Sequence, residues 1–230
     1  MKELSPTELR IPSAHGDVHA LLLRPQAADW LYVLAHGAGA GMRHTFMDDI
    51  AGRLAARNIA TLRYEYPYMT AGLKRPDRAP KNEAVTRAAC DFAAREFAAG
   101  ERPLRLCAGG KSMGGRMTSQ AQAAGALPRV EALVFLGFPL HRPGSVSAER
   151  AAHLHDVAVP MLFLQGTRDK LADLALMRSV TAELGTGATL HVVDGADHSF
   201  HVLKRSGRSE GEALDEMADA IATWLSAVPS

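Results

Sequence analysis

Short apolar runs alternate with segments of helical spacing along most of this chain. Residues 30–35, Trp-Leu-Tyr-Val-Leu-Ala, form a continuous apolar run typical of a strand that is buried on both faces. Residues 46–57 instead place Phe46, Ile50 and Leu54 at the spacing of a helix. Strands that alternate with helices are joined by right-handed crossovers and form a mostly parallel sheet. We therefore predict an α/β fold with helices on both faces of the sheet, in a single domain over residues 1–230.

The same patterns predict the individual elements. Residues 4–11 and 18–24 flank a polar turn and are expected to form a β-hairpin. Further strands are expected over residues 30–35, 59–64, 104–108, 130–136, 160–164 and 189–193. Helices are expected over residues 46–57, 84–99, 112–124, 148–155, 171–184 and 210–227.

Residues 66–82 show no periodic pattern and are expected to form a long irregular loop. Four basic residues lie in it, Lys74, Arg75, Arg78 and Lys81. They could attract an anionic substrate or simply form a solvated surface.

Composition argues against several classes of partner. The chain has 26 basic and 25 acidic residues and a net charge of +1, so we expect neither nucleic acid nor membrane as a partner. Two cysteines, Cys90 and Cys107, lack the spacing of a metal site and are expected to be buried thiols. Residues 1–6 carry no apolar signal region, and no run of about 18 apolar residues occurs. These features favour a cytoplasmic protein, and no metal or cofactor is expected.

A glycine-rich turn follows the predicted strand at 104–108. Residues 109–115 read Gly-Gly-Lys-Ser-Met-Gly-Gly and contain the pattern G-x-S-x-G around Ser112. This pattern describes a sharp turn from strand to helix that exposes a serine hydroxyl, with small residues beside it because bulk would collide. Ser112 could instead be an ordinary helix N-cap. A phosphate-binding loop would need glycine at position 105, which is Arg105.

Two other strand ends carry groups that can work with a serine. Asp169 follows the predicted strand at 160–164, and His198 follows the strand at 189–193. Ligands of open α/β sheets bind beyond the carboxyl ends of the strands, so the three side chains are expected to meet. In such a set, His198 would take the proton of Ser112, and Asp169 would orient the imidazole.

Alternatives for these roles exist nearby. Asp194 or Asp197 could replace Asp169 as the acid, although the side chain of Asp197 should point away from the adjacent His198. His201 could replace His198 as the base. Each of these residues lies near the end of the strand at 189–193.

A serine hydrolase also needs N–H donors for the oxyanion and a substrate pocket. We expect one donor at Met113 and the other in the turn at 36–41, with Ala38 preferred to Gly39 and His36 shaping the turn. The side chains considered for the pocket are Tyr66, Tyr68, Met69, Phe138, His141 and Phe200. Partial burial as packing residues explains these six equally well.

These segments resemble the α/β-hydrolases of the dienelactone-hydrolase-like class, and most closely the KANL3/Tex30-like sub-group. The resemblance rests on residues 36–40, 63–68, 110–116, 137–141, 165–169 and 197–200. It implies a sheet of seven or eight strands, with the nucleophile after the fifth, the acid after the seventh and the histidine after the eighth. Dienelactone hydrolases use cysteine as the nucleophile, so Ser112 argues against carrying over their lactone specificity.

Residues 140–160 leave room for one short helix, so we expect a minimal lid or none. We predict a serine hydrolase that cleaves a small carboxylic ester or thioester through an acyl-enzyme on Ser112. Two alternatives stay open: a non-catalytic scaffold or ligand-binding protein on the same fold, and a serine peptidase or acyltransferase. The expected partner is a small ester-like molecule, and the sequence does not distinguish a monomer from a homodimer.

Overall fold

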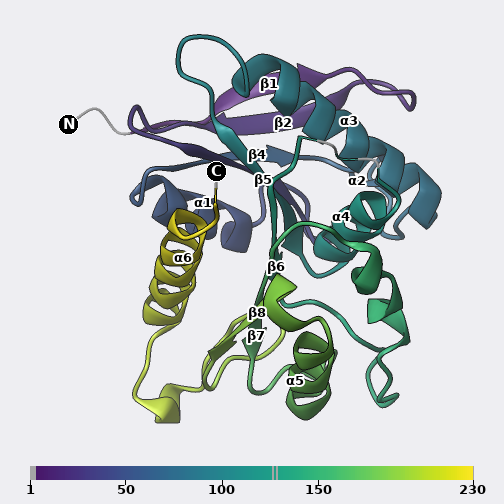
Figure 1. Ribbon diagram of the computed structural model, residues 1–230, viewed down its shortest axis with the longest axis vertical. Helices are drawn as coiled ribbons and strands as arrows, with labels where there is room; N and C mark the ends of the chain where they lie inside the picture. Colours follow the sequence, from purple (N-terminus) through teal and green to yellow (C-terminus); the bar gives the residue numbers. More distant parts are fainter. Residues whose placement is uncertain (1–3, 126, 128, 230) are drawn as a thin grey trace.

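A twisted sheet forms the centre of the structure (Figure 1). The computed structural model describes residues 4–125, 127 and 129–229, and these residues form an eight-stranded sheet in the order β1-β2-β4-β3-β5-β6-β7-β8. The strands are β1 (Thr7–Ile11), β2 (Val18–Leu23), β3 (Trp30–Ala35), β4 (Ile59–Tyr64), β5 (Arg105–Lys111), β6 (Ala132–Leu136), β7 (Met161–Gly166) and β8 (Ala188–Val193).

Strand direction decides where functional groups can gather. β1 and β2 form the predicted hairpin, and β2 pairs with β4 in antiparallel fashion. From β4 through β3 to β8 all neighbouring strands are parallel. The carboxyl ends of β3, β5, β7 and β8 therefore open on the same edge of the sheet.

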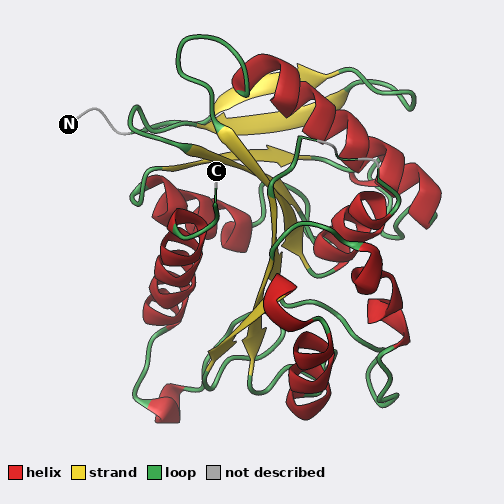
Figure 2. Ribbon diagram, viewed as in Figure 1, coloured by secondary structure: helices red, strands yellow, loops and turns green. Residues whose placement is uncertain are grey.

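Helices cover both faces of the sheet (Figure 2). The helices are α1 (Thr45–Ala55), α2 (Pro67–Thr70), α3 (Ala79–Phe97), α4 (Met113–Ala123), α5 (Leu174–Glu183) and α6 (Glu210–Ser226), with 3₁₀ turns η1 (Glu149–Asp156), η2 (Gly185–Gly187) and η3 (Lys204–Ser206). In Figure 1, α1 and α6 lie on one side of the sheet, and α3, α4 and α5 lie on the other. Each side buries its own apolar cluster, one including Ile50 and Ile221 and the other including Val85 and Met177.

The predicted fold class is confirmed, while some boundaries differ. The expected loop at 66–82 is wrong in part, because it contains α2 and the first residues of α3. Pro80 lies in the first turn of α3, where its fixed φ favours a helix. Because N–H groups of the first turn have no acceptor within the helix, the absence of an N–H on proline costs no hydrogen bond there. β5 runs on to Lys111, beyond the predicted end at 108. Residues 1–3 of the N-terminal segment, and residues 126, 128 and 230 of the expected domain, lie outside the described residues.

Of the described helices, η1 is the one that lies between β6 and β7, which agrees with the expected minimal lid.

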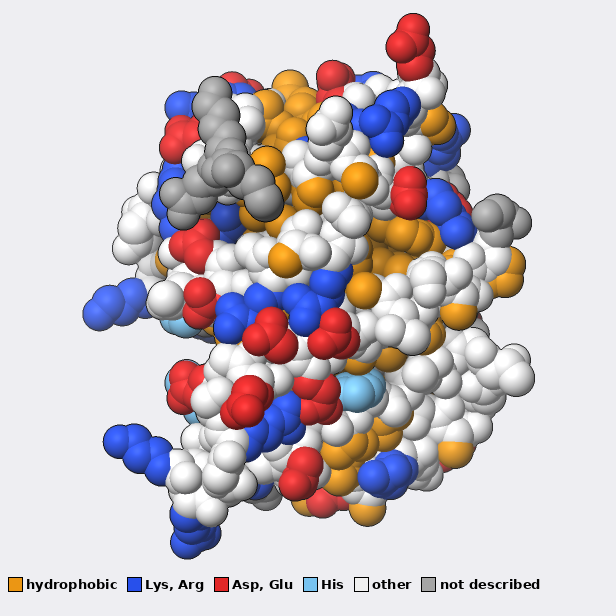
Figure 3. All heavy atoms as spheres, turned by 90° about the vertical axis from the view of Figure 1, so that its left-hand side faces the viewer, with side chains coloured by type: hydrophobic (Ala, Val, Ile, Leu, Met, Phe, Trp, Pro, Cys, Tyr) orange, Lys and Arg blue, Asp and Glu red, His pale blue; other side chains and the backbone are white. Residues whose placement is uncertain are grey.

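In the described ranges no helix is both long and apolar enough to span a bilayer. On the face formed by α1 and α6, basic and acidic side chains are intermingled (Figure 3), and Arg53 and Arg57 pair there with Asp215 and Asp219.

Candidate active site

Ser112 lies at a strained turn between β5 and α4. Its backbone has φ 49° and ψ −111°, which is unusual for a residue other than glycine. The turn packs closely on the end of β3: a Cβ at Gly110 would lie 2.1 Å from the Ala35 carbonyl oxygen, and one at Gly114 would lie 2.6 Å from Ala35 Cβ. The two glycines of G-x-S-x-G are therefore required by close packing, and they let the serine project from the sheet.

The side chain of Ser112 makes no capping bond to α4, although the residue occupies the N-cap position. Its Oγ lies 2.8 Å from Nε2 of His198, and Nδ1 of His198 lies 2.7 Å from Oδ2 of Asp169. The carboxylate can only accept, so Nδ1 carries the proton and Nε2 is the acceptor that faces the serine hydroxyl. The three side chains thus form one continuous chain of hydrogen bonds.

The carboxylate of Asp169 is held from two directions. Its Oδ1 accepts a hydrogen bond from the Leu171 N–H at 2.7 Å, and its Oδ2 also accepts one from the side-chain amide of Gln165. The side chain is 1% exposed, whereas that of His198 is 23% exposed. A buried acid behind a partly open imidazole fixes the orientation of the ring while leaving its other nitrogen accessible.

The residues considered as alternative acids and base have other partners or are exposed. Asp194 accepts a hydrogen bond from the Thr167 hydroxyl at 3.3 Å. Asp197 Oδ1 accepts from the backbone N–H groups of Ser199 and His201, at 2.8 and 3.0 Å, and so closes the turn that carries His198. His201 is exposed. None of these groups takes part in the contact between Asp169 and His198.

Two backbone N–H groups beside Ser112 have no acceptor among the described residues. Met113 is the first residue of α4, where N–H groups have no acceptor within the helix. The N–H of Ala38 forms no hydrogen bond with the described residues. The N–H of Gly39, our second choice, is instead engaged with Tyr68 Oη at 3.1 Å, which does not fit that expectation. His36 shapes the turn, since its Nδ1–H donates to the Gly37 carbonyl oxygen at 2.7 Å.

Two cavities meet at Ser112, and both are also lined by Ala38 and Leu171. The larger, of about 630 Å³, contains His198 and is called the His198-side cavity. The smaller, of about 300 Å³, contains Arg116 and is called the Arg116-side cavity. The side chains that line the first but not the second include Thr45, Phe46, Lys111, Phe200 and Leu214.

Of the six side chains considered for the pocket, Phe200 lines a cavity beside Ser112. The other five belong to the packing around the site. The hydroxyl of Tyr66 contacts Thr86 at 3.0 Å, and Phe138 packs against Phe135 with ring centroids 5.3 Å apart. His141 links the Arg142 carbonyl oxygen to the Asp173 N–H. Tyr68 Oη accepts a hydrogen bond from the Gly39 N–H, and Met69 packs on the apolar core.

A second serine–histidine contact, which sequence reasoning missed, joins α4 to η1. Ser119 Oγ lies 2.7 Å from His153 Nε2 and 3.0 Å from the Arg116 carbonyl oxygen. Ser119 is fully buried within the helix, and His153 pairs with no acid among the described residues. Burial, with a smaller effect from Arg116, lowers the pKa of His153. We interpret this contact as a structural one that holds η1 against α4.

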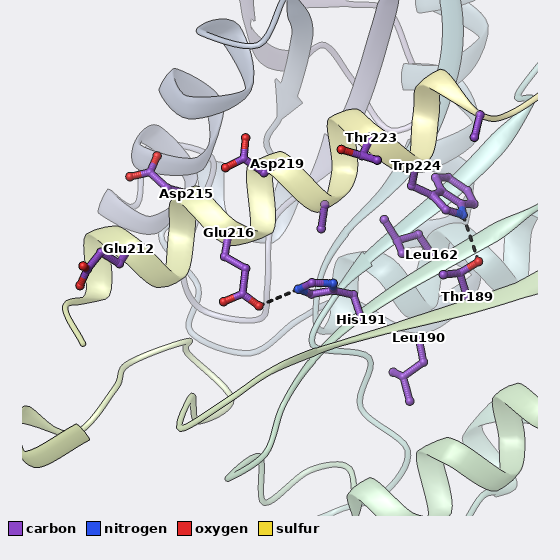
Figure 4. A pocket seen from close by; sticks show the side chains of 12 residues that line it. Leu162, Thr189, Leu190, His191, Glu212, Asp215, Glu216, Asp219, Thr223 and Trp224 are labelled. Atoms are coloured by element: carbon purple, nitrogen blue, oxygen red, sulfur yellow. Dashed lines mark hydrogen bonds and ion pairs between the residues drawn. The ribbon is translucent and has the colours of Figure 1, made fainter. Parts of the chain in front are cut away.

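A third cavity, of about 840 Å³, lies away from Ser112, between α6 and the edge strand β8 (Figure 4). His191 contacts Glu216 across it at 2.7 Å, and Trp224 donates to Thr189 at 3.1 Å. Its acidic groups are largely paired with arginines, including Arg57 with Asp219 and Arg208 with Glu216. Its lining, as far as the structure describes it, includes no serine or cysteine.

Three solved structures share this architecture. An alpha-beta serine hydrolase homologue from Coxiella burnetii is 17% identical with a TM-score of 0.75, over 98% of this chain and 100% of that chain. A dienelactone hydrolase from Anabaena variabilis is 20% identical with a TM-score of 0.75, over 98% and 100%. A serine hydrolase without lid from Xanthomonas campestris is 19% identical with a TM-score of 0.73, over 98% and 97%.

The sheet order and the serine at the strand-to-helix turn define an α/β-hydrolase fold. The chain belongs to the alpha/beta hydrolase domain family, whose model matches residues 28–226. The superfamily expected from the sequence is thereby confirmed, whereas the narrower likeness to the KANL3/Tex30-like sub-group stays a prediction.

Proposed function

We propose that this protein is a serine hydrolase that cleaves a small carboxylic ester or thioester through an acyl-enzyme on Ser112. The observation that supports this most strongly is the hydrogen-bonded chain from Ser112 through His198 to the buried Asp169. A serine hydroxyl is a poor nucleophile until a positioned base takes its proton, and His198 Nε2 is in position to do so. The strained backbone of Ser112 further favours a reactive role over a structural one.

In the first half of the reaction, Ser112 Oγ attacks the carbonyl carbon while its proton passes to His198 Nε2. The carbonyl oxygen becomes an oxyanion, which the N–H groups of Met113 and Ala38 would stabilise. The bond from carbon to the leaving oxygen or sulfur then breaks. His198 gives its proton to the leaving group, and the alcohol or thiol departs.

In the second half, water replaces the alcohol. His198 takes a proton from the water as its oxygen bonds to the acyl carbon, and the bond from that carbon to Ser112 Oγ breaks. His198 returns the proton to Oγ, and the carboxylic acid leaves. Asp169 stays ionised throughout and stabilises the imidazolium that forms twice.

The first test is labelling with a fluorophosphonate probe, followed by ester turnover. We expect Ser112→Ala to lose labelling and to lower kcat by at least about 10³-fold, because the nucleophile is removed. Ser119→Ala is the matched control, since Ser119 also contacts a histidine but lies inside a helix. It should keep the label.

Labelling that persists in Ser112→Ala and disappears in Ser119→Ala would move the nucleophile to α4. A folded native protein that takes no label at all would favour the scaffold alternative. Circular dichroism of both variants shows whether the fold is retained.

A further inference from the structure

Two arginines face the small cavity next to Ser112. Arg116 comes from α4, one turn after the serine, and Arg150 comes from η1. Neither guanidinium forms an ion pair with a carboxylate of the described residues; Arg150 Nη1 donates to the His141 carbonyl oxygen at 3.1 Å. Burial, followed by the neighbouring charge of Arg150, lowers the pKa of Arg116. Two positive charges therefore lie close together without an acidic counter-charge in contact.

The acidic groups around this cavity form no ion pair with either arginine within the described residues. Asp77 also lines the wall, but its Oδ2 pairs with Lys81 Nζ at 2.9 Å. Glu83 attracts Arg116 electrostatically without forming an ion pair within 4.0 Å. Asn82 is 1% exposed and adds a polar group, whose Oδ1 has no partner among the described residues. The wall thus offers donors for an anion together with two buried oxygens, Asn82 Oδ1 and Asp77 Oδ2, that accept no hydrogen bond from the described residues.

The chemistry of the proposed hydrolysis assigns the two cavities to the two halves of an ester. The leaving oxygen has to come within reach of His198 Nε2 to receive its proton. The alcohol part therefore belongs in the His198-side cavity. The Arg116-side cavity holds Ser112 and both oxyanion donors but not His198, so it suits the acyl part.

We propose that the Arg116-side cavity binds an acyl group that ends in a carboxylate, an inference that rests on the proposed function. The substrates would then be monoesters of short dicarboxylic acids. Arg116 and Arg150 would hold the distal carboxylate by charge-assisted hydrogen bonds. The reaction consumes one water and yields the alcohol, a dicarboxylate and a proton. The cavity of about 300 Å³ favours a short acyl chain.

Two esters that differ in one charge test this assignment. Ethyl hydrogen succinate ends in a carboxylate, and ethyl levulinate replaces one carboxylate oxygen with a methyl group at nearly the same volume. Both release ethanol, so kcat/KM follows from one assay of ethanol formation. We expect the native protein to prefer the anionic ester by about 10-fold or more, the scale of a charge-assisted contact.

The preference is measured as the ratio of kcat/KM for the anionic ester to kcat/KM for the neutral ester. Arg116→Gln should lower this ratio by about 10- to 100-fold. Arg116→Lys keeps the positive charge and should retain part of the preference. Arg75→Gln is the matched control, because it removes an exposed charge near Pro76 that does not line the cavity. The ratio should not change in that variant. Arg150→Gln provides an independent second variant.

A native protein that takes the fluorophosphonate label but hydrolyses both esters equally well would overturn the assignment of the cavity and leave the serine hydrolase intact. The assignment of the cavity would also be overturned if Arg75→Gln lowered the ratio of the two kcat/KM values as much as Arg116→Gln does. The preference for the anionic ester would then come from the general surface charge. Failure of the label itself would instead refute the proposed function.

Discussion

At the scale of single residues, Lys111 is the side chain beside Ser112 whose role the motif does not explain. It is 8% exposed, and its Nζ donates to the His198 carbonyl oxygen at 2.6 Å. The ammonium also lies 5.5 Å from the ring centroid of Phe200 and 6.0 Å from that of Phe46. This lysine thereby joins the serine turn to the loop that carries the histidine.

Burial lowers the pKa of Lys111 to about 8, against a smaller opposing effect of Asp169 and Asp197. The folded-state pKa lies below that of the unfolded chain, so between pH 8 and about 10.4 the unfolded state binds more protons. Stability contributed through this group therefore rises with pH across that window.

We expect Lys111→Met to remove this pH dependence. The free energy of unfolding of the native protein, relative to the variant, should increase between about pH 8 and 10, by at most about 1.4 kcal/mol per pH unit. Urea denaturation at several pH values measures it. A constant difference between the two proteins would show that the lysine does not titrate in this range.

At the scale of elements, the junction of β5 and α4 is packed so closely that two of its glycines leave no room for a Cβ. A Cβ on Gly114 would lie 2.6 Å from Ala35 Cβ and 2.7 Å from the His36 carbonyl oxygen, so α4 would have to move away from β3. The same turn positions Ser112 and the Met113 N–H. Packing and the candidate site are therefore coupled at this junction.

Gly114→Ala is expected to destabilise the protein by about 1–3 kcal/mol, as overpacking of a core does, and to reduce labelling of Ser112. Gly52→Ala in α1 is the matched control, because a Cβ there has no neighbour within 4 Å. It should be neutral or stabilising by up to about 1 kcal/mol, since alanine favours helices. Thermal unfolding of both variants checks the sign, and a Gly114→Ala variant as stable as the native protein would contradict the close approach of α4 to β3.

At the scale of the whole molecule, the size of the proposed acyl cavity limits which substrates we expect. A single 3₁₀ turn among the described helices lies between β6 and β7, and the cavity assigned to the acyl group has about 300 Å³. Long acyl chains would extend into water and gain little from apolar burial.

We therefore expect kcat/KM for neutral ethyl esters to fall from butanoate to decanoate. Activity should also show no increase when the ester concentration passes its solubility limit, because no lid has to open at an interface. A profile that rises steadily with chain length would point to a longer channel than the one described. The rate is measured while the concentration of one ester is raised from below its solubility limit, where the ester is dissolved, to above it, where it forms an emulsion.

The sequence alone determined the fold class, the order of the strands along the chain and the choice of Ser112, Asp169 and His198 as candidates, because apolar periodicity and strand-end position are local properties. Local pattern also explains the errors: the continuation of β5 through its glycines and the early start of α3 depend on neighbouring strands and on the first turn of a helix. Among the six pocket candidates, Phe200 lines a cavity beside Ser112. The sequence could not separate it from Tyr66 and Phe138, because these two become buried packing residues only once the sheet is assembled.

Only the tertiary structure decided which of several acids contacts His198, that the Gly39 N–H is taken by Tyr68, and that Arg116 and Arg150 meet in one cavity. The residues brought together in this way lie 29 to 34 positions apart in the chain. No local pattern specifies them, because they arise from the packing of helices and loops around a common sheet edge.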